Sequence, residues 1–439
     1  MTARPAWSGM FSDGLDTADA KMARLLRSEV SRQRASVNLI ASESYCPRAT
    51  IMAEASILVN KNASGYPGRR EVGGCDVIDE IERLAVARAR ALFEAEHANV
   101  QALASTVANV AVFRALLRPG DRVLALDAAA GGHHSHGASG HLSGQDYEVV
   151  VFGVDETTAA IDLTEVSLLA ERVRPRLVVA GSTAYPRAID FRGLRDVATS
   201  VGAMLFADIA HVAGLVVAGL HDNPVPYADV VTTSTHKTLC GPRTGGVVLS
   251  KARLAAVLDA AIFPGIQGAP GAHIIAGRAV LFELVGQEPF RRLMQAVVAN
   301  AAALAEALAG DGLALYTGGT DTHMVVVDLG AGDWDRHSIN TLLESHGILA
   351  NAVTLPSRGG RPRAGVRLGT TAMTIRGMDE VAMRRLGAVV ALLLNRGPDR
   401  PALSEIRREM ADLAADHPLP AGMDETRDDA WHPSGHHVG

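Results

Sequence analysis

Reactive side chains follow the ends of two predicted strands. One apolar run ends in Asp208, with His211 close behind it, and a second is followed directly by His236 and Lys237. Because ligands of open α/β sheets bind beyond the carboxyl ends of the strands, we expect these groups at one sheet edge. A lysine amine there can form an imine with an aldehyde cofactor, while a carboxylate keeps a pyridinium nitrogen protonated. The pattern predicts Schiff-base chemistry, although an aspartate that closes a strand can equally be a helix cap.

The choice of cofactor lysine is narrow. Four of the 42 basic residues are lysines, namely Lys21, Lys61, Lys237 and Lys251. Lys237 precedes a glycine-rich turn, TLCGPRTGG, where the backbone can approach a ligand closely. The others fall on a predicted surface helix, before a loop and after a strand, where solvated roles are expected. Lys237 is therefore the candidate.

Two further groups of residues could contact a cofactor. Ser105 and Thr106 precede a predicted helix, whose N-terminus could bind a phosphate, although an ordinary N-cap is the alternative. The motif GGHHSHG offers His133, His134 and His136. Zinc would be possible there, but no cysteine is close, and stacking of one imidazole on an aromatic cofactor explains the motif equally well. We predict no metal site.

A single arginine could hold a substrate carboxylate. Arg367 lies in the predicted strand GVRLGT, where its guanidinium could clamp a carboxylate in a bidentate manner. A surface salt bridge is the alternative.

These residues must be positioned by an α/β sheet. Predicted helices, among them 77–92, 107–117 and 194–201, alternate with short apolar runs. Runs that are apolar throughout and separated by helices indicate a mostly parallel sheet that is covered on both faces. The runs span residues 121–127, 147–154, 176–182, 203–210, 228–235 and 245–250.

The chain divides into four predicted parts. Residues 1–50 form an N-terminal arm with an amphipathic helix at 19–33, and residues 51–290 form the large domain. A long helix at 288–309 leads to a small α/β domain at 291–415, and the polar segment 416–439 is predicted to be disordered. The small domain is predicted to contain strands at 323–329 and 365–370 and helices at 338–346, 378–395 and 403–414.

Composition excludes several classes of protein. The 439 residues are 48% apolar and 21% charged with a net charge of -6, which excludes a disordered or fibrous chain and argues against nucleic acid as a partner. No run of 18 apolar residues and no signal peptide are evident, so we expect a cytoplasmic protein without a membrane partner. Cys46, Cys75 and Cys240 form no CxxC pair, which suits a reducing compartment.

Seven segments together resemble serine hydroxymethyltransferase, a fold type I enzyme that uses pyridoxal 5'-phosphate (PLP). The resemblance runs from about residue 10 to about residue 412, and the THKT and DIAHVAGL blocks are its most specific parts. The segments are LIASES (39–44), GYPGRREVGGCDVIDEIERLA (65–85), GGHHSHG (131–137), FADIAHVAGLVVAG (206–219), VTTSTHKTLCGPRTGG (231–246), FPGIQGAPGAHIIAGRAV (263–280) and GVRLGTTAMTIRG (365–377).

The resemblance implies an α/β fold and a set of roles. The large domain would hold a mostly parallel seven-stranded sheet, followed by a small C-terminal α/β domain. PLP would be the cofactor, and Lys237, His133, Asp208 and His211 would be catalytic. Cofactor contacts would come from Ser105, Thr106, His133, Thr183, Asp208, His211, His236 and Lys237, and substrate contacts from Ser42, Arg367, Asn62 and Ser64. The family usually has a serine at the position of Thr183.

The departures from the family concentrate in the folate half of the site. Asn62 replaces a tyrosine, and Ser64 replaces the glutamate that serves as acid and base beside the substrate hydroxyl and folate. Glu71 and Val72 replace two further tyrosines, and Ala128 replaces a leucine. The segment LPSRGGRPRA also lacks the family's NKNSVP asparagine, and Ala269 replaces a glycine.

These departures favour carbon–carbon bond chemistry without folate. The main hypothesis is an L-threonine transaldolase or aldolase of specialised metabolism, such as antibiotic biosynthesis, which forms a glycyl quinonoid and uses an aldehyde acceptor. The alternative is a divergent serine or α-methylserine hydroxymethyltransferase that uses tetrahydrofolate, and a non-catalytic paralogue is the alternative of another class. Segments 62–74 and 263–271 would reach a neighbouring subunit, so we expect a homodimer or higher homo-oligomer with shared sites.

Overall fold

The large domain is built on one seven-stranded sheet. The computed structural model describes residues 7–243, 245–332, 334–358, 361–396 and 400–423. All six apolar runs form strands, and only β10 runs against the others, so the expected fold class is confirmed. In spatial order the strands are β4 (His97–Asn99), β10 (Gly246–Ser250), β9 (Val230–Ser234), β8 (Met204–Asp208), β7 (Leu177–Gly181), β5 (Arg122–Leu126) and β6 (Glu148–Phe152).

Each face of this sheet packs on its own core, which explains the continuous apolar runs. Leu124, Val178 and Leu205 face one core, whereas their neighbours Leu177 and Phe206 face the other. The first core includes residues of α5 (Asp76–Phe93), α8 (Leu163–Val173), α9 (Phe191–Ser200), α10 (Ala213–Val217) and α12 (Ala272–Val285). The second includes residues of α6 (Ser105–Leu116) and α11 (Ala255–Ala260), and α7 (Leu142–Asp146) packs beside α6.

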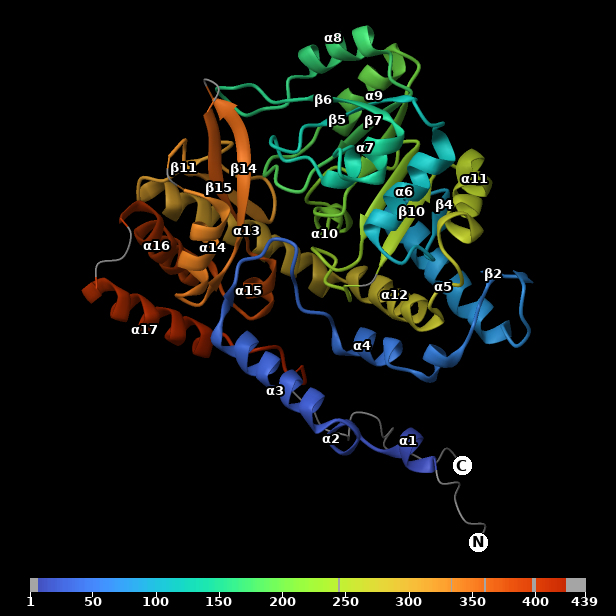
Figure 1. Ribbon diagram of the computed structural model, residues 1–439, viewed down its shortest axis with the longest axis horizontal. Helices are drawn as coiled ribbons and strands as arrows, with labels where there is room; N and C mark the ends of the chain where they lie inside the picture. Colours follow the sequence, from blue (N-terminus) through green and yellow to red (C-terminus); the bar gives the residue numbers. More distant parts are fainter. Residues whose placement is uncertain (1–6, 244, 333, 359–360, 397–399, 424–439) are drawn as a thin grey trace.

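Helix α13 (Glu288–Gly310) joins the two domains (Figure 1). Phe290, Met294 and Val297 belong to the large-domain core, and Leu304 and Leu308 belong to the small-domain core. Within the described chain, α13 is the one helix whose length and apolarity would suffice to cross a membrane. Its burial between two cores accounts for that composition.

The small domain holds a four-stranded antiparallel sheet. Its order is β11 (Ala314–Leu315), β12 (Met324–Asp328), β15 (Arg361–Gly369) and β14 (Asn351–Arg358). The predicted strands at 323–329 and 365–370 correspond to β12 and β15, whereas β14 was not predicted. Its helices are α14 (Arg336–Glu344), α15 (Thr371–Ile375), α16 (Glu380–Arg396) and α17 (Arg400–Asp416).

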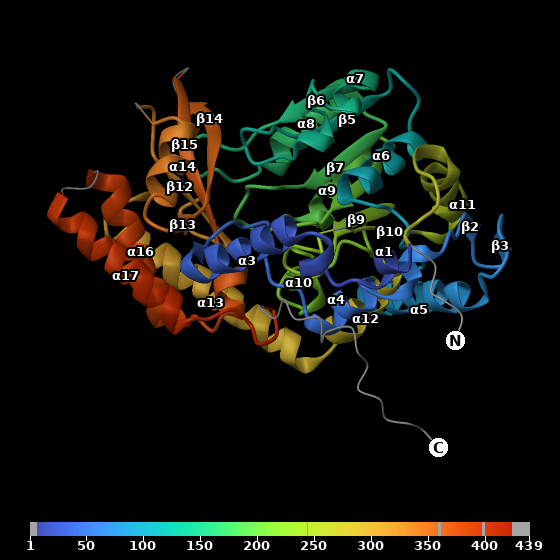
Figure 2. The ribbon, with the colours of Figure 1, turned by 60° about the horizontal axis from the view of Figure 1, so that its bottom comes forward.

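The N-terminal arm extends below the body of the molecule in Figure 1 and lies in front of it in Figure 2. It comprises α1 (Ser8–Ser12), α2 (Leu15–Ala18) and α3 (Ala20–Ala35), and then β1 (Val37–Asn38), which pairs with β13 (Ile348–Leu349). Arg376 holds its end in place by donating to the carbonyls of Ser36, Ala414 and His417. The segment predicted to be disordered begins beside this contact, and residues 424–439 lie outside the described chain. The arm then leads to α4 (Arg48–Glu54) and the short helix η1 (Ile57–Asn60).

Candidate active site

Ten of the twelve sequence-predicted site residues line one cavity of about 370 Å³. The cavity lies beyond the carboxyl ends of β8 and β9, where ligands of open α/β sheets bind. The ten are Ser42, Ser105, Thr106, His133, Thr183, Asp208, His211, His236, Lys237 and Arg367. Arg243 also lines the cavity and was not predicted.

Lys237 presents a buried amine in this cavity. It follows β9 and a run of buried hydroxyl residues, and its carbonyl accepts a hydrogen bond from Cys240 N. Burial lowers the pKa of Lys237 to about 8, although the negative charge of Asp208 opposes the shift. About a tenth of this amine is therefore uncharged, and so nucleophilic, at pH 7, far more than for an ordinary lysine.

Asp208 is held as a carboxylate. Burial alone would raise its pKa, but the hydrogen bond with His136 and the electrostatic interaction with that ring bring the pKa well below its usual range. His136 Nε2 lies 2.9 Å from Asp208 Oδ2, and Asn109 Nδ2 lies 2.7 Å from the same oxygen. Asn109 accepts in turn from Thr232, 2.7 Å away. A buried, supported negative charge suits a ring nitrogen that must keep its proton.

Sequence reasoning missed both supports of Asp208. His136 stood in the GGHHSHG motif, but the motif did not indicate which imidazole would reach the carboxylate. Asn109 carried a weaker signal, as a polar residue within the apolar helix α6.

His133 lies beside them as a neutral ring. Its Nδ1 is 2.7 Å from Ser135 Oγ, and its ring centroid is 4.0 Å from that of His134. Burial lowers the pKa of His133 to about 3. Among the described residues no group of three potential ligands could hold a metal ion, so the zinc alternative finds no support there.

The cavity also offers hydrogen-bond donors that have no partner among the described residues. Ser105 and Thr106 are the first two residues of α6, and the N-cap, Ala104, makes no side-chain capping bond. The ordinary-cap alternative therefore does not apply to these two hydroxyls. Buried His236 Nδ1 has no partner in the described structure, and burial lowers the pKa of His236 to about 4. A helix N-terminus with free donors suits a phosphate group, and Arg243 adds a positive charge nearby.

Arg367 closes the cavity from the small domain. It donates to the carbonyl and the hydroxyl of Thr183 and, through Nη2, to Asn351 Oδ1 2.9 Å away. Its Nε is buried without a partner, while burial lowers its pKa to about 10, which leaves it a cation. Because Arg367 is only 8% exposed, the surface salt bridge is not its role.

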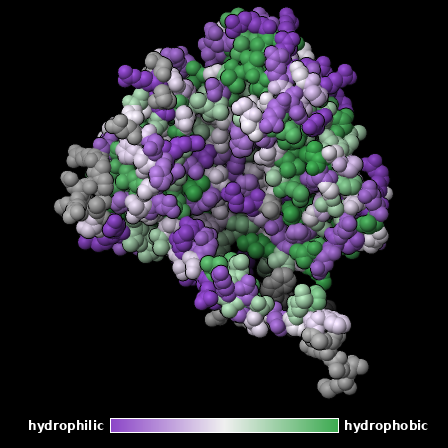
Figure 3. Space-filling view, in the orientation of Figure 1, coloured by the Kyte–Doolittle hydropathy of each residue, from purple (hydrophilic) through white to green (hydrophobic). Residues whose placement is uncertain are grey.

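A second cavity of about 680 Å³ adjoins the first and shares Thr183 and Arg367 with it. It lies between the domains, and Figure 3 shows a hollow with hydrophilic surroundings near the middle of this face. Ala128, His134 and Arg336 line it. The two cavities together could hold a cofactor and a larger second substrate.

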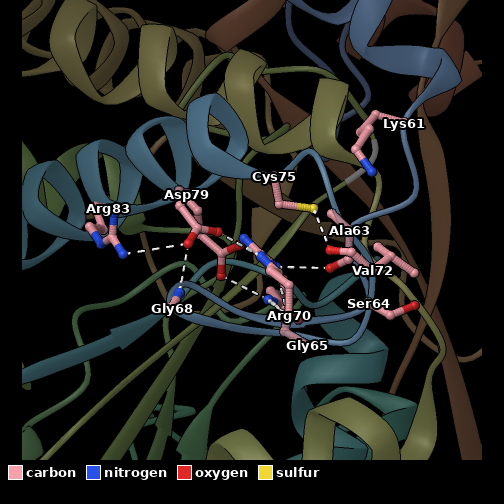
Figure 4. Close-up of polar contacts among 12 residues, drawn as sticks. Lys61, Ala63, Ser64, Gly65, Gly68, Arg70, Val72, Cys75, Asp79 and Arg83 are labelled. Atoms are coloured by element: carbon pink, nitrogen blue, oxygen red, sulfur yellow. Dashed lines mark hydrogen bonds and ion pairs between the residues drawn. The ribbon is translucent and has the colours of Figure 1, made fainter.

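Asn62 and Ser64 do not line the Lys237 cavity of their own chain. They precede the hairpin of β2 (Gly65–Tyr66) and β3 (Arg69–Arg70), and Ser64 Oγ donates to Asn62 Oδ1 at 2.9 Å. The buried guanidinium of Arg70 donates to the carbonyls of Ala63 and Gly65, on either side of Ser64 in the chain. The Ser64 hydroxyl points away from this guanidinium (Figure 4). Asn62 and Ser64 are therefore displayed outward.

Comparison with known proteins agrees with this geometry. The serine hydroxymethyltransferase family profile matches residues 15–390. The chain belongs to the serine hydroxymethyltransferase family. It is 45% identical to a serine hydroxymethyltransferase of Myxococcus xanthus over 407 aligned residues, and the aligned region covers 92% of this chain and 97% of the relative. It is 43% identical to serine hydroxymethyltransferase 2 of Rhodospirillum rubrum over 430 aligned residues, and the aligned region covers 96% of this chain and 100% of the relative.

Membership of this family identifies a PLP-dependent enzyme of fold type I. The cavity fits PLP: it offers a buried amine, a buried carboxylate and unpartnered donors at a helix N-terminus. The hypothesis of a non-catalytic paralogue is set aside.

Proposed function

We propose that the protein is a serine hydroxymethyltransferase that cleaves the Cα–Cβ bond of L-serine and passes the one-carbon unit to tetrahydrofolate. The observation that carries the proposal is the single cavity in which Lys237, Asp208 and Arg367 meet. Relatives that cover nearly the whole chain carry this name. These relatives favour a folate-dependent hydroxymethyltransferase over the transaldolase that we inferred from the departures in the loop 62–74.

Each group in the cavity has a task in this proposal. Lys237 would hold the PLP aldehyde, Asp208 would keep the proton on the ring nitrogen, and the start of α6 with His236 would hold the phosphate; all of these residues line the cavity. Bound PLP acts as an electron sink for a carbanion at the amino-acid Cα.

The small domain and the arm hold the amino acid. Arg367 and Ser42 bind its carboxylate, which fixes the orientation of the bond that breaks. His133, a neutral imidazole that lines the cavity, would lie against the cofactor ring, and the uncharged amine of Lys237 can accept and return a proton near neutral pH.

A specific observation favours a second candidate, a folate-independent L-threonine aldolase or transaldolase with an aldehyde co-substrate. Ser64 lacks the carboxyl group that would move a proton at the substrate hydroxyl, and a serine hydroxyl cannot replace it near neutral pH. Glu71 is exposed at a different point of the loop. The small side chain of Ala128 leaves room in the adjoining cavity for a bulky aldehyde.

The site is also proposed to be shared between two copies of the chain. Asn62 and Ser64 face outward, and hydrophobic residues gather where α6 and α11 reach the surface (Figure 3). An apolar hollow between these helices is lined by Val110, Val257 and Ile266. We infer that a second copy covers this face and that the outward-facing loop 62–74 reaches the partner's cavity.

Substrate tests separate the two candidates. The PLP-loaded protein is incubated with L-serine or L-threonine, each with and without tetrahydrofolate and with a panel of aldehydes, and Lys237→Ala serves as the inactive control. Serine consumption that requires tetrahydrofolate supports the hydroxymethyltransferase. Threonine cleavage without folate, with serine inert, supports the second candidate, and inertness of both contradicts the two together.

A further inference from the structure

A further buried histidine, His323, lies next to the cavity and contacts two other parts of the chain. His323 directly precedes β12 and is fully buried, yet it is not among the residues that line the cavity. Its Nε2 lies 3.1 Å from the carbonyl of Ala41, in the segment that carries Ser42. The same nitrogen lies 3.5 Å from His211 Nδ1, and the two rings are nearly parallel, at 21°.

The carbonyl of Ala41 determines the tautomer of His323. A carbonyl oxygen can only accept, so Nε2 of His323 must carry the proton. Burial lowers the pKa of His323 to about 3 and lowers that of His211 well below its ordinary value, so both rings are neutral and carry one proton each. His323 Nδ1 is therefore unprotonated, and it has no partner in the described structure.

The proton on His323 in turn determines the tautomer of His211. The one hydrogen on His323 Nε2 is shared between the Ala41 carbonyl at 3.1 Å and His211 Nδ1 at 3.5 Å. A second hydrogen on His211 Nδ1 would oppose it, so His211 Nδ1 accepts the longer branch of this shared hydrogen bond. The proton of His211 is then on Nε2, which lies 3.1 Å from Thr183 Oγ1. His211 therefore donates to Thr183.

Thr183 Oγ1 receives a second hydrogen bond, from Arg367 Nη1 at 3.0 Å. With two donors occupying its lone pairs, the hydroxyl has only its own hydrogen left to offer. Thr183 lines the cavity, so this hydrogen is available to an acceptor bound there.

We propose that His323 is a positioning residue that fixes the direction of the hydrogen bonds running through His211, so that the Thr183 hydroxyl is always a donor to an oxygen of the bound cofactor. This series of hydrogen bonds starts at the carbonyl of Ala41. Because a carbonyl oxygen can only accept, the direction of the hydrogen bonds is fixed. The inference rests on the cofactor site of the proposed function, but not on which amino acid is cleaved.

The test measures the pH midpoint of the visible absorbance change of bound PLP, without turnover. Loss of a donor disfavours the more negative form of the cofactor, so the midpoint should rise. Thr183→Val, which removes the hydroxyl at nearly constant shape, is expected to raise it by about 0.5 to 1 unit. The other charged or titratable groups around His211, namely Lys237, Arg367 and His133, stay unchanged in every variant.

Two amide variants at His323 form a matched pair. His323→Gln places an N–H near the position of Nε2 and should leave the midpoint within about 0.2 units of wild type. His323→Asn cannot reach Ala41 from the same backbone position and should raise the midpoint by about 0.5 unit or more. If His323→Asn does not fold, His323→Phe takes its place.

The double variant decides whether His323 acts through Thr183. In Thr183→Val with His323→Asn the midpoint should match that of Thr183→Val alone, because the hydroxyl to be oriented is gone. Additive shifts, a Gln variant as perturbed as the Asn variant, or no shift in Thr183→Val would overturn the proposal. Loss of serine turnover with these absorbance results intact would instead count against the proposed function.

Discussion

At the scale of single residues, the environment of Lys237 sets a pH dependence. The folded-state pKa of this amine is lowered to about 8 by burial, against about 10.5 for an ordinary lysine. The amine must be uncharged to react with the PLP aldehyde, so the uncharged fraction rises as pH passes through the folded pKa.

Reconstitution of the apoprotein with PLP should therefore accelerate with rising pH, with a midpoint near 8. Stopped-flow absorbance at fixed PLP concentration measures this rate, and Lys237→Ala provides the baseline. A midpoint near 10 would show that Lys237 is solvated rather than buried beside Asp208.

Asp208 gives a second prediction at this scale. Replacement by the isosteric amide, Asp208→Asn, removes the negative charge at nearly constant shape and turns one of the two acceptor oxygens into an NH2 donor. The neutral side chain no longer favours a protonated ring nitrogen, so we expect kcat to fall by about 100-fold or more while PLP remains bound. Steady-state kinetics with cofactor quantification measures both, and unchanged kcat would remove Asp208 from the reaction.

At the scale of elements, the hairpin that displays Ser64 depends on one buried cation. The Arg70 side chain is 5% exposed and pairs with Asp79 at 2.8 Å and with Glu82 at 2.6 Å. Gly65, at the first strand of the hairpin, has φ +93, and a Cβ there would lie 2.4 Å from the carbonyl of Arg69. Backbone geometry and buried charge therefore both fix the loop.

Removal of the Arg70 side chain should lower the stability of the fold. In Arg70→Met the carboxylates of Asp79 and Glu82 stay buried without their partner, and the free energy of unfolding should fall by about 3 to 5 kcal/mol. Arg83→Met is the matched control, because Arg83 is 58% exposed and only 3.4 Å from Asp79, and it should cost less than about 1 kcal/mol. Urea unfolding compares the two; equal costs would mean that the Arg70 network does not hold the loop.

The predictability of the elements follows from their burial. The six apolar runs could be assigned as strands because both sheet faces are covered, which leaves no polar interruption. Strand β4 has only three residues, and β14 contains Pro356 and exposed positions, so neither shows an apolar pattern. The site residues at strand ends were predictable for the same reason, whereas Asn109 and His323 depend on tertiary contacts that sequence spacing does not reveal.

At the scale of the whole molecule, the arm and the outward loop point to a dimer. Met10 and Phe11 are 83% and 80% exposed on α1, a helix that extends beyond the body of its own chain (Figure 1). Large exposed apolar side chains of this kind favour burial against a partner.

The full chain should sediment as a dimer or larger assembly at micromolar concentration, with an interface of about 2,000 Å² or more. The double variant Met10→Glu with Phe11→Glu should weaken the dimer by about tenfold or more. Leu168→Glu, on α8 and 50% exposed, is the control and should leave assembly unchanged. Analytical ultracentrifugation makes the comparison, and a fully active wild-type monomer would contradict a shared site.

Transfer of label from [3-¹³C]serine to tetrahydrofolate is the direct test of the proposed serine hydroxymethyltransferase activity. The PLP-loaded protein is incubated with the labelled amino acid and folate, and ¹³C NMR follows both products. We expect glycine and a labelled methylene group on the folate in equal amounts, with neither formed by Lys237→Ala. Serine that stays intact while unlabelled threonine is cleaved in the absence of folate would contradict it.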